Sequence, residues 1–576
     1  MGEILRTARD IVDVALKPKP ELLIHNGNLP STAEALRDLL GTCNRLFERG
    51  VPVRLVPSLE NGPPSAIPLT RSNVVMEAHR LCQPVKLDKH GELIEVTLSD
   101  RVAQMYLEMF GEWHLQPLVG ISMSPLLSAD GSVRAADGYD RETGLWCCRI
   151  PHLALSQHPS RLDAEVALRH LRLAFRTFPF SDAERSRTSQ GVEIVDVTSS
   201  PGRDESAFLV SLLTACCRSC LELAPGVLLT APTLSGAGSG KGLLVRAICA
   251  IAFGIRPRAF TMGSDRHELD KRLAAELVEA QPALFLDNAN GVALRSDTLA
   301  SVLTERPARV RLLGQTRMVP LNSTAFIAVT GNGLTVSEDL ARRFICCELD
   351  ARCEDPESRP FAAGFLNDIE QRRGEFLAAA LTIWRWGRQN ATALQRGKPL
   401  GSFETWAQWC RDPLLALGCR DPVERIEALK AQDPKRLRIA ELFSTWWEHH
   451  GETPVKCSQL ADPVREIADA QGRGRQYLAT FIAGLAGTHA AGFVLTRQEG
   501  AGKWNAATYV LKRAAPDDRI GHRTHRTHRA HDLDGSKPVA NEPPPAGAPI
   551  TPMTPMSPMP YATADDTVPP GRETEI

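Results

Sequence analysis

One short stretch constrains the fold of this chain more than any other: residues 235–242, with the sequence SGAGSGKG. An apolar run at residues 227–229 precedes it, and a second apolar run at residues 243–248 follows it. This order predicts a buried strand that turns through a glycine-rich loop into a helix. Glycines let backbone N–H groups surround an oxyanion, the helix N-terminus adds positive charge, and Lys241 can reach the terminal phosphates of a nucleotide. The stretch therefore predicts a phosphate-binding loop.

The loop departs from the usual pattern G-x-x-x-x-G-K-[ST] at both of its ends. Ser235 stands in place of the first glycine, and Gly242 stands in place of the hydroxyl residue that binds magnesium. A flexible Gly/Ser loop before a helix is the alternative interpretation of these residues taken alone. The sequence downstream favours the phosphate-binding interpretation.

Three polar features follow apolar segments further along the chain. The run ALFLD predicts a buried strand that ends in Asp287, a carboxylate suited to magnesium. The run AFIAVT predicts another strand, after which Asn332 can orient a water molecule against a γ-phosphate. Arg342 and Arg343 come next, and their guanidinium groups suit the nucleotide of a neighbouring subunit. The order and spacing of these features indicate a nucleoside-triphosphatase site.

These residues resemble the functional positions of AAA+ ATPases. They look like the Walker A, Walker B, sensor 1 and arginine-finger positions of that family, in this order: Lys241, Asp287 with Asn288, Asn332, and Arg342 with Arg343. The chain is particularly similar to superfamily 3-like helicases and to the helicase part of primase-helicase proteins from phages, plasmids and other mobile elements. That similarity extends over residues 20–515 and rests on three sequence segments: GYDRETGLW at 138–146, LLGQTRMVPLNSTAFIAVTGN at 312–332 and EDLARRF at 338–344.

The resemblance implies an α/β fold in which a parallel sheet with flanking helices forms an AAA+ P-loop core that binds ATP and Mg²⁺. It implies that Asp287 holds the metal and that Lys241, Asn332, Arg342 and Arg343 take part in catalysis. The arginines would act on the next subunit of a homo-oligomeric ring, which is a hexamer in this family. The residues implied in binding the nucleotide are Gly236, Ala237, Gly238, Ser239, Gly240, Lys241, Gly242 and Leu243.

Two departures from the family pattern bear on catalysis. Gly242 offers no hydroxyl to magnesium, so the metal would depend on Asp287, phosphates and water. Asn288 stands where many AAA+ proteins have a catalytic glutamate, which leaves the base that activates water unassigned. Glu268 and Glu305 are the candidates for that role.

Composition limits the remaining function classes. The net charge is −1, so any contact with DNA must come from local basic patches. Cys217 and Cys220 form a C-x-x-C pair without a second ligand pair, so the 14 cysteines are expected to be thiols in a reducing cytoplasm. No apolar run is long enough to span a bilayer, and the N-terminus lacks a signal-peptide core. We therefore expect a soluble, cytoplasmic protein with no membrane partner.

Patterning divides the chain into six expected parts. Dipeptides such as Asp-Gly near residues 130–138 predict hairpins, and the acidic residues Asp137, Asp140 and Glu142 are expected to form turns rather than a metal site. The expected parts are a small α/β unit (1–65), an α+β accessory domain (66–160), the ATPase core with its leading helix (161–355), a helical lid packed by tryptophans (356–434), a winged-helix-like domain (435–514) and a disordered tail (515–576).

Two regions are candidates for DNA contact. Residues 303–320 carry four arginines around a Gly-Gln turn, and the resemblance places a pore hairpin there, with Arg311 and Arg317 as the DNA-gripping residues. Three helices and a hairpin in 435–514 match the winged-helix pattern, in which Arg475 and Lys503 would contact the DNA backbone. A solvated arginine face and a protein-contact module are the respective alternatives.

Taken together, the sequence predicts an ATP-dependent DNA helicase or translocase, acting on single-stranded or forked DNA in the replication of a bacterial mobile element. It leaves open whether primase activity resides in this chain or in a separate partner. Two alternatives remain: a DNA-binding initiator or loader that ATP switches without unwinding, and an interaction scaffold whose ATPase has decayed. Gly242 and Asn288 are the residues that keep the last alternative open.

Overall fold

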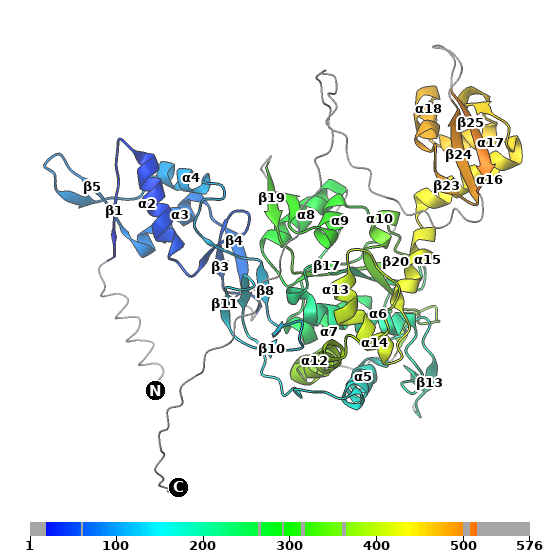
Figure 1. The fold of residues 1–576 in the computed structure, drawn as a ribbon, viewed down its shortest axis with the longest axis horizontal. Helices are drawn as coiled ribbons and strands as arrows, with labels where there is room; N and C mark the ends of the chain where they lie inside the picture. The colour runs from blue at the N-terminus through cyan, green and yellow to red at the C-terminus, as the bar shows by residue number, and fades with distance from the viewer. Residues whose placement is uncertain are drawn as a thin grey trace, which may run out of the picture. The chain divides into compact units, whose positions relative to one another are not determined.

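The structure is a computed structural model that describes residues 19–58, 62–189, 191–262, 266–290, 293–312, 317–359, 364–498 and 507–514. The expected disordered tail (515–576) and Lys503 lie outside these ranges. The described chain is a mixed α/β structure with a parallel sheet and many helices (Figure 1). None of its described helices combines the length and the apolar character that a membrane crossing requires.

A five-stranded parallel sheet forms the centre of the protein. Its strands stand in the order β16-β17-β20-β15-β21, so that β20 lies between β17 and β15. Because every strand of the sheet is parallel, the carboxyl ends of all five meet at one edge. The bounds of the strands are β15 Gly226–Ala231, β16 Ala259–Phe260, β17 Ala283–Leu286, β20 Phe326–Asn332 and β21 Phe344–Glu348.

Side chains that alternate along these strands fill two separate hydrophobic cores. Val227 and Leu229 of β15 pack into one core, while Leu228 packs into the other. Burial of both faces explains why the strands are apolar at nearly every position. The first core also contains α5 (Arg161–Phe175), α6 (Arg203–Cys217), α7 (Lys241–Phe253) and α12 (Arg373–Gln389); the second contains α8 (Arg266–Val278), α9 (Asp297–Thr304) and α10 (Glu338–Ala341).

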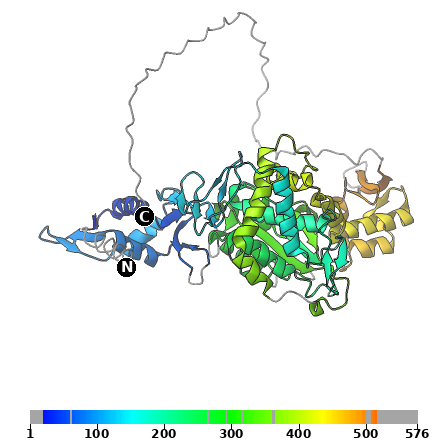
Figure 2. The same ribbon diagram turned by 90° about the horizontal axis from the view of Figure 1, so that it is seen from below.

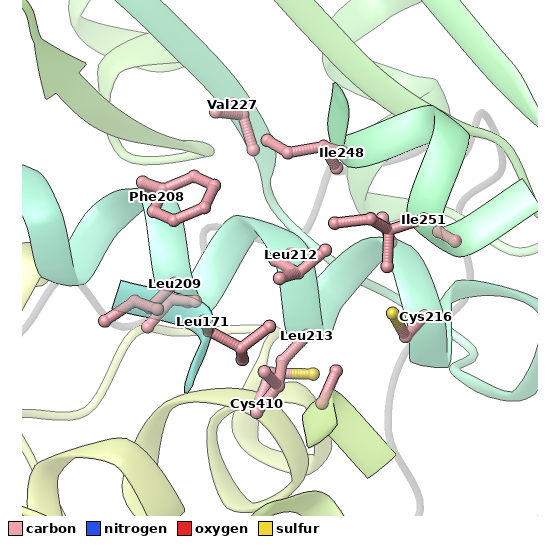
Figure 3. Packing of buried hydrophobic residues seen from close by; sticks show 14 of the residues in the cluster. Leu171, Phe208, Leu209, Leu212, Leu213, Cys216, Val227, Ile248, Ile251 and Cys410 are labelled. Atoms are coloured by element: carbon pink, nitrogen blue, oxygen red, sulfur yellow. The ribbon is translucent and has the colours of Figure 1, made fainter. Parts of the chain in front are cut away.

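Helix α6 is the centre of the first core. Phe208 points toward Val227 of the sheet, and Leu212 faces Ile248 and Ile251 of α7 (Figure 3). On the other side, Leu213 lies near Cys410 of a following helical segment. Every residue of α6 from 204 to 217 is buried, which explains why its sequence shows no polar face.

The first core continues across the predicted boundary between the ATPase core and the helical lid. Helix α12 lies side by side with α5 (Figures 1 and 2). Trp384 and Trp406 are completely buried, and Trp386 and Trp409 are nearly so, which confirms the prediction that these tryptophans pack a core. The other helices of this region are α11 (Phe365–Gln371), α13 (Glu404–Trp406) and α14 (Asp412–Ala416).

The described residues before residue 148 form short strands and three helices. Strand β3 pairs with β4 in antiparallel fashion from Val53↔Pro68 to Val56↔Ser65, so the boundary predicted at residue 65 falls within one sheet. A hairpin forms at β9–β10, with Asp130 and Gly131 in its turn as predicted, and another forms at β11–β12, whose turn is residues 141–144. The bounds are β1 Glu21–Leu23, α2 Leu29–Gly41, β2 Leu46–Glu48, β3 Pro52–Val56, β4 Ser65–Pro68, α3 Arg71–Leu81, β5 Gln83–Leu87, β6 Leu93–Glu95, α4 Asp100–Leu107, β7 Gln116–Pro117, β8 Gly120–Ser122, β9 Leu126–Leu127, β10 Val133–Arg134, β11 Gly138–Asp140 and β12 Leu145–Cys147.

A buried arginine ties this part to the second core. The Arg49 guanidinium donates hydrogen bonds of 2.6–3.0 Å to the carbonyl oxygens of Leu277, Leu118 and Val119. Burial lowers the pKa of Arg49 to about 10. The partners of this buried charge are therefore carbonyl dipoles from two parts of the chain, rather than a carboxylate.

Residues 434–498 and 507–513 form a small unit with its own core around Leu442 and Trp446. Three helices precede a long β24–β25 hairpin, as the sequence predicts. The bounds are α15 Ile426–Ala431, which leads into the unit, α16 Pro434–His450, β22 Val455–Lys456, α17 Asp462–Ala468, α18 Arg475–Gly484, β23 His489–Ala490, β24 Phe493–Gln498 and β25 Thr508–Arg513.

A buried ion pair fixes α5 against α6. Arg172 donates to both carboxylate oxygens of Glu205, at 2.7 and 3.0 Å, and also to the carbonyl oxygens of Val197 and Ser199. The two paired side chains are only 7% and 3% exposed. A pair of this kind is costly to break because the charge that remains has no partner in the interior.

Arg172→Met is therefore expected to lower the free energy of unfolding by about 3–5 kcal/mol. Urea unfolding followed by tryptophan fluorescence measures the change. Arg161→Met is the matched control, since Arg161 pairs with Glu165 on the exposed surface of the same helix and such a pair contributes about 0.5 kcal/mol. Equal effects of the two substitutions would contradict a special role for the buried pair.

Candidate active site

The glycine-rich loop joins β15 to α7, which confirms the predicted order of strand, loop and helix. Strand β15 ends at Ala231 and α7 begins at Lys241. Gly240 precedes the helix with φ +95°, a backbone conformation that residues with a Cβ rarely adopt. The first turn of α7 therefore directs its free N–H groups toward the carboxyl edge of the sheet.

Lys241 is the cationic centre of the loop. Its Nζ donates hydrogen bonds to the carbonyl oxygen of Gly236 at 2.6 Å, to Ser239 Oγ at 3.1 Å and to Asn332 Oδ1 at 2.6 Å. Burial lowers the pKa of Lys241, and the nearby charge of Asp287 opposes this effect. Three oxygen acceptors thus hold the ammonium group where phosphate oxygens could take their place.

Asp287 directly follows the last residue of β17. Its carboxylate accepts a hydrogen bond from the Thr330 hydroxyl, and that hydroxyl in turn accepts from the backbone N–H of Asn288 at 3.3 Å. Thr330 lies on β20, the neighbouring strand, and is buried. One carboxylate is therefore held at the strand end beside Asn332, and Mg²⁺ commonly binds through one or two carboxylates together with phosphates.

Asn290 is a member of this site that the sequence analysis did not identify. Its Oδ1 accepts a hydrogen bond from the backbone N–H of Asn332 at 2.6 Å, and its Nδ2 donates to Asn288 Oδ1. The side chain thereby connects the turn after β17 to the end of β20. The two asparagines in the string DNAN were the available signal, but only pairing of β17 with β20 gives the second one a partner.

Glu357 is a second unexpected neighbour. A Cβ atom at Gly238 would lie 2.3 Å from Glu357 Cγ and 2.9 Å from its backbone nitrogen. Glu357 belongs to the short 3₁₀ helix η2 (Pro356–Ser358), more than 100 residues further along the chain. No pattern in the sequence links these two segments, which only the three-dimensional structure brings together.

The two arginines predicted as fingers lie away from the loop of their own chain. The carbonyl oxygen of Arg343 accepts from the N–H of Gly226, the first residue of β15, whereas the loop follows the last residue of that strand. Six residues of strand span about 20 Å. Both guanidinium groups pair with Asp339, and Arg342 is the more exposed, at 58% against 15% for Arg343. Burial lowers the pKa of Arg343.

The other catalytic candidates have local partners. Glu268 pairs with Arg272 at 3.2 Å and lies 3.9 Å from Lys271, both on its own helix. Glu305 accepts from Ser301 Oγ and interacts electrostatically with Arg343. Neither contact brings a carboxylate to the loop.

Arg373 lies at the end of α7 that is remote from the glycine-rich loop. Its guanidinium donates to the carbonyl oxygens of Ile251 and Ala252 at 3.1 Å. These carbonyls are at the C-terminal end of α7, whereas the loop is at the N-terminal end of that helix. Arg372 instead pairs with Asp368 and Glu375 on the protein surface.

The arginine-rich segment forms an antiparallel ladder, with β18 (Ala308–Arg311) paired to β19 (Met318–Leu321). Arg311 is the last residue of β18 and is exposed. Arg317 directly precedes β19, and its guanidinium carbon lies 3.7 Å from the centroid of the Phe110 ring. Phe110 is itself 49% exposed, so a cation and an aromatic ring share this surface.

The predicted contact residues of the C-terminal unit are only partly described. Arg475 is the first residue of α18 and is exposed. Arg473 lies over the Tyr477 ring at 4.8 Å, and Tyr477 stacks on Phe481 with 6.0 Å between ring centroids. The N-terminal part of α18 therefore carries both arginine and aromatic groups.

Two further motifs of the sequence are the Cys217–Cys220 pair and the acidic residues around Asp140. Cys217 is buried and Cys220 is half-buried, and both are free thiols. Asp140 caps a turn by accepting from the N–H and the hydroxyl of Thr143 at 2.9 Å. Within the ranges that the structure describes, no three His, Cys, Asp or Glu side chains gather as a metal-binding group.

Comparisons with known proteins give little beyond this geometry. No protein-family model matches the chain, and no curated protein matches it. Among solved structures it is similar to the apo A form of the NrS-1 C-terminal region, with 14% identity and a TM-score of 0.28, covering 58% of this chain and 84% of that one. It is also similar to the "SCCmec type IV Cch - active helicase", with 11% identity and a TM-score of 0.32, covering 82% of this chain and 92% of that one. At these TM-scores the likeness carries no functional inference, which has to come from the site.

Gly331→Ala is expected to destabilise the protein by about 1–3 kcal/mol. The new Cβ would lie 2.7 Å from the carbonyl oxygen of Ala289, and the N–H of Ala289 is held by Thr330, so the backbone cannot move without breaking the site. Thermal unfolding measures the effect. Gly374→Ala, with open space around its Cβ and a helical backbone, should leave stability unchanged or raise it by up to about 1 kcal/mol; a loss equal to that of Gly331→Ala would contradict the steric explanation.

Proposed function

We propose that this protein is an ATP-hydrolysing AAA+ enzyme of the superfamily 3-like type, which moves along or unwinds DNA in the replication of a bacterial mobile element. The observation that carries the proposal is the convergence of three strand ends. Lys241 Nζ lies 2.6 Å from Asn332 Oδ1, and Asp287 is bonded to the same strand as Asn332 through Thr330. Cation, amide and carboxylate are the groups that bind a triphosphate and its metal.

The residues present fit a magnesium nucleotide. The N–H groups of residues 236–243 and the ammonium of Lys241 would hold the phosphates. Asp287 would hold magnesium, which neutralises charge on the phosphates when bound. Lys241 is already surrounded by oxygen acceptors, so exchange of these for phosphate oxygens requires no new type of interaction.

Asn332 would then position the attacking water. Its Oδ1 is free to leave Lys241 once phosphate binds there, while its backbone stays fixed by Asn290. A positioned amide contributes to rate mainly by holding the nucleophile in line with the phosphoryl group. The charge that develops on that group requires a further cation.

Arg342 and Arg343 would supply this cation to a neighbouring subunit. They stand at the opposite edge of the sheet from the loop of their own chain, so action between subunits is the arrangement their position supports. A homo-oligomeric ring, a hexamer by resemblance to the family, provides that arrangement. The exposed guanidinium of Arg342 is the more accessible of the two.

One observation favours the alternative of a nucleotide-switched initiator. Asn288 has φ +61°, a left-handed conformation in which Asn is favoured and most other residues are strained by roughly 1–2 kcal/mol. Its Oδ1 accepts from Asn290. The backbone at this position thus suits the asparagine present and disfavours the catalytic glutamate of faster ATPases, which is compatible with slow turnover and a role as a switch.

ATP hydrolysis with and without single-stranded DNA tests the proposal. Wild type is expected to hydrolyse ATP faster with DNA, and Lys241→Ala is expected to lose nucleotide binding because the principal phosphate cation is removed. Arg342→Ala and Arg343→Ala should bind ATP normally but lose turnover by about 10³-fold or more for whichever is the finger. Mixtures of Lys241→Ala with the inactive arginine variant should regain part of the activity.

The control for the lysine is Lys89→Ala, an exposed residue of the N-terminal part that should behave as wild type. ATP binding without turnover in wild type would favour the switch. Failure of wild type to bind ATP would contradict both the helicase and the nucleotide-switched initiator. The interaction scaffold would then be the remaining alternative.

The hairpin is proposed to grip DNA through Arg311 and Arg317. Each substitution by alanine should weaken binding of single-stranded DNA severalfold. It should also reduce the slope of log affinity against log salt concentration by about one, because one fewer counterion is released. Phe110→Ala should weaken binding with little change in salt slope, since a ring offers stacking and no charge. Fluorescence anisotropy across a salt series measures all three, with Arg161→Ala on α5 as the control. Unchanged affinity in both arginine variants would contradict the hairpin grip.

A further inference from the structure

Gly242 and Arg246 stand one turn apart on α7, at the point where the chain departs from the usual phosphate-binding pattern. A Cβ atom at Gly242 would lie 2.8 Å from Arg246 Nη1 and 3.9 Å from Arg246 Cζ. The side chain that a serine or threonine would have at 242 thus falls on the guanidinium of Arg246. The absence of a hydroxyl at position 242 and the presence of Arg246 are therefore linked, because the two side chains would occupy the same space.

The guanidinium is directed toward the nucleotide end of the helix. Side chains of a helix lean toward its N-terminus, and Arg246 Cζ lies 5.3 Å from the centroid of the Phe285 ring. Phe285 lies on β17 and Asp287 directly follows the end of that strand, two residues further on, so the alternation of the strand directs both side chains to the same face of the sheet. Arg246 therefore lies between the first turn of α7 and the strand that ends in the carboxylate.

Arg246 also has unused donors. It is half-buried, and among the described residues it has the Phe285 ring as a contact but neither a carboxylate nor a hydrogen-bond acceptor. A guanidinium carries five N–H donors and stays charged, and its planar fork matches phosphate oxygens. An arginine held in this way beside a phosphate-binding loop has donors ready for an anion.

We propose that Arg246 is a triphosphate-binding residue, and that it supplies to the phosphates the positive charge that a hydroxyl-bound magnesium supplies in loops of the usual pattern. The inference rests on the proposed function, because it concerns the same nucleotide. Gly242 is glycine because any side chain there would displace the guanidinium. Nucleotide binding by this protein accordingly depends less on divalent cations than the resemblance implies.

The competing explanation is that Arg246 only packs on Phe285. Arg246→Met separates the two roles, because methionine keeps an apolar stem over the ring and removes the charge. Arg246→Lys keeps the charge on a different geometry. A structural role predicts that methionine is the better replacement, whereas phosphate binding predicts that lysine is.

The experiment is isothermal titration calorimetry with ATP, in EDTA and again in magnesium chloride, on the full chain. Wild type is expected to bind ATP in EDTA, Arg246→Met to bind it about tenfold to a hundredfold more weakly there, and Arg246→Lys to fall between them. Thermal unfolding shows that each variant is folded.

Equal affinity of wild type and Arg246→Met in EDTA would overturn the proposal, as would a wild type that binds only with magnesium. Absence of binding to wild type under both conditions would overturn the proposed function itself, and this inference with it. The two failures are therefore distinguishable.

A second pair of variants tests the coupling between the two positions. Gly242→Ser is tolerated by the fold because the atom in its way is the mobile end of a side chain. It should weaken ATP binding in EDTA in the wild-type background, and it should strengthen magnesium-dependent binding in the Arg246→Met background, where the hydroxyl has room. The same effect of Gly242→Ser in both backgrounds would show that the two residues act independently, which contradicts the proposal.

Discussion

The position of β20 between β15 and β17 is the constraint on which the candidate site depends. A lysine at the start of a helix after β15 and an aspartate after β17 would lie two strands apart with nothing between them. Strand β20 fills that space and brings Asn332 to Lys241 at 2.6 Å and Thr330 to Asp287. Its apolar residues divide between the two cores, so the packing that stabilises the sheet also fixes the distances of the site. Strand β20 therefore contributes both to the packing of the sheet and to the geometry of the candidate site.

Several arginines in the interior have carbonyl oxygens as partners. Arg49, Arg218 and Arg306 each donate to two or more backbone carbonyls, and burial lowers the pKa of all three. Arg218 and Arg306 share the carbonyl of Ser323. Carbonyls satisfy a guanidinium without adding a second charge to the interior, and they can be drawn from segments far apart in the sequence. The arginines of residues 303–320 are therefore not equivalent: Arg306 is part of the framework, whereas Arg309 and Arg311 face solvent.

Much of the candidate site could be predicted from the sequence because its residues sit at the ends of apolar runs. An apolar run of five or six residues followed by a polar residue specifies a strand and its carboxyl end, and this was sufficient for Lys241, Asp287 and Asn332. The apolar runs do not specify which strands are neighbours in the sheet, so they do not identify Asn290 or Glu357. Their roles depend on which segments lie side by side.

The domain boundaries show the same limit. Turn-forming residues near 65 and 356–360 suggested separate units, but β3 pairs with β4 across the first position and one hydrophobic core spans the second. Proline and glycine mark where a chain turns, and a turn within a domain has the same composition as a linker between domains. The burial of Trp384 and Trp406 was predictable from their spacing, whereas their partners on α6 were not.

The placement of Lys241 and Arg343 at opposite edges of one sheet has a genetic consequence. If each nucleotide is served by the lysine of one chain and the arginine of the next, a chain that lacks the arginine leaves its own lysine intact and disables its neighbour. Such a chain would be dominant in a cell that also makes the normal protein, since every mixed assembly would contain defective sites in normal subunits. A chain that lacks the lysine would lose only the site that it builds itself. Either substitution would thus remove one site per altered chain, from the altered chain itself in one case and from its normal neighbour in the other.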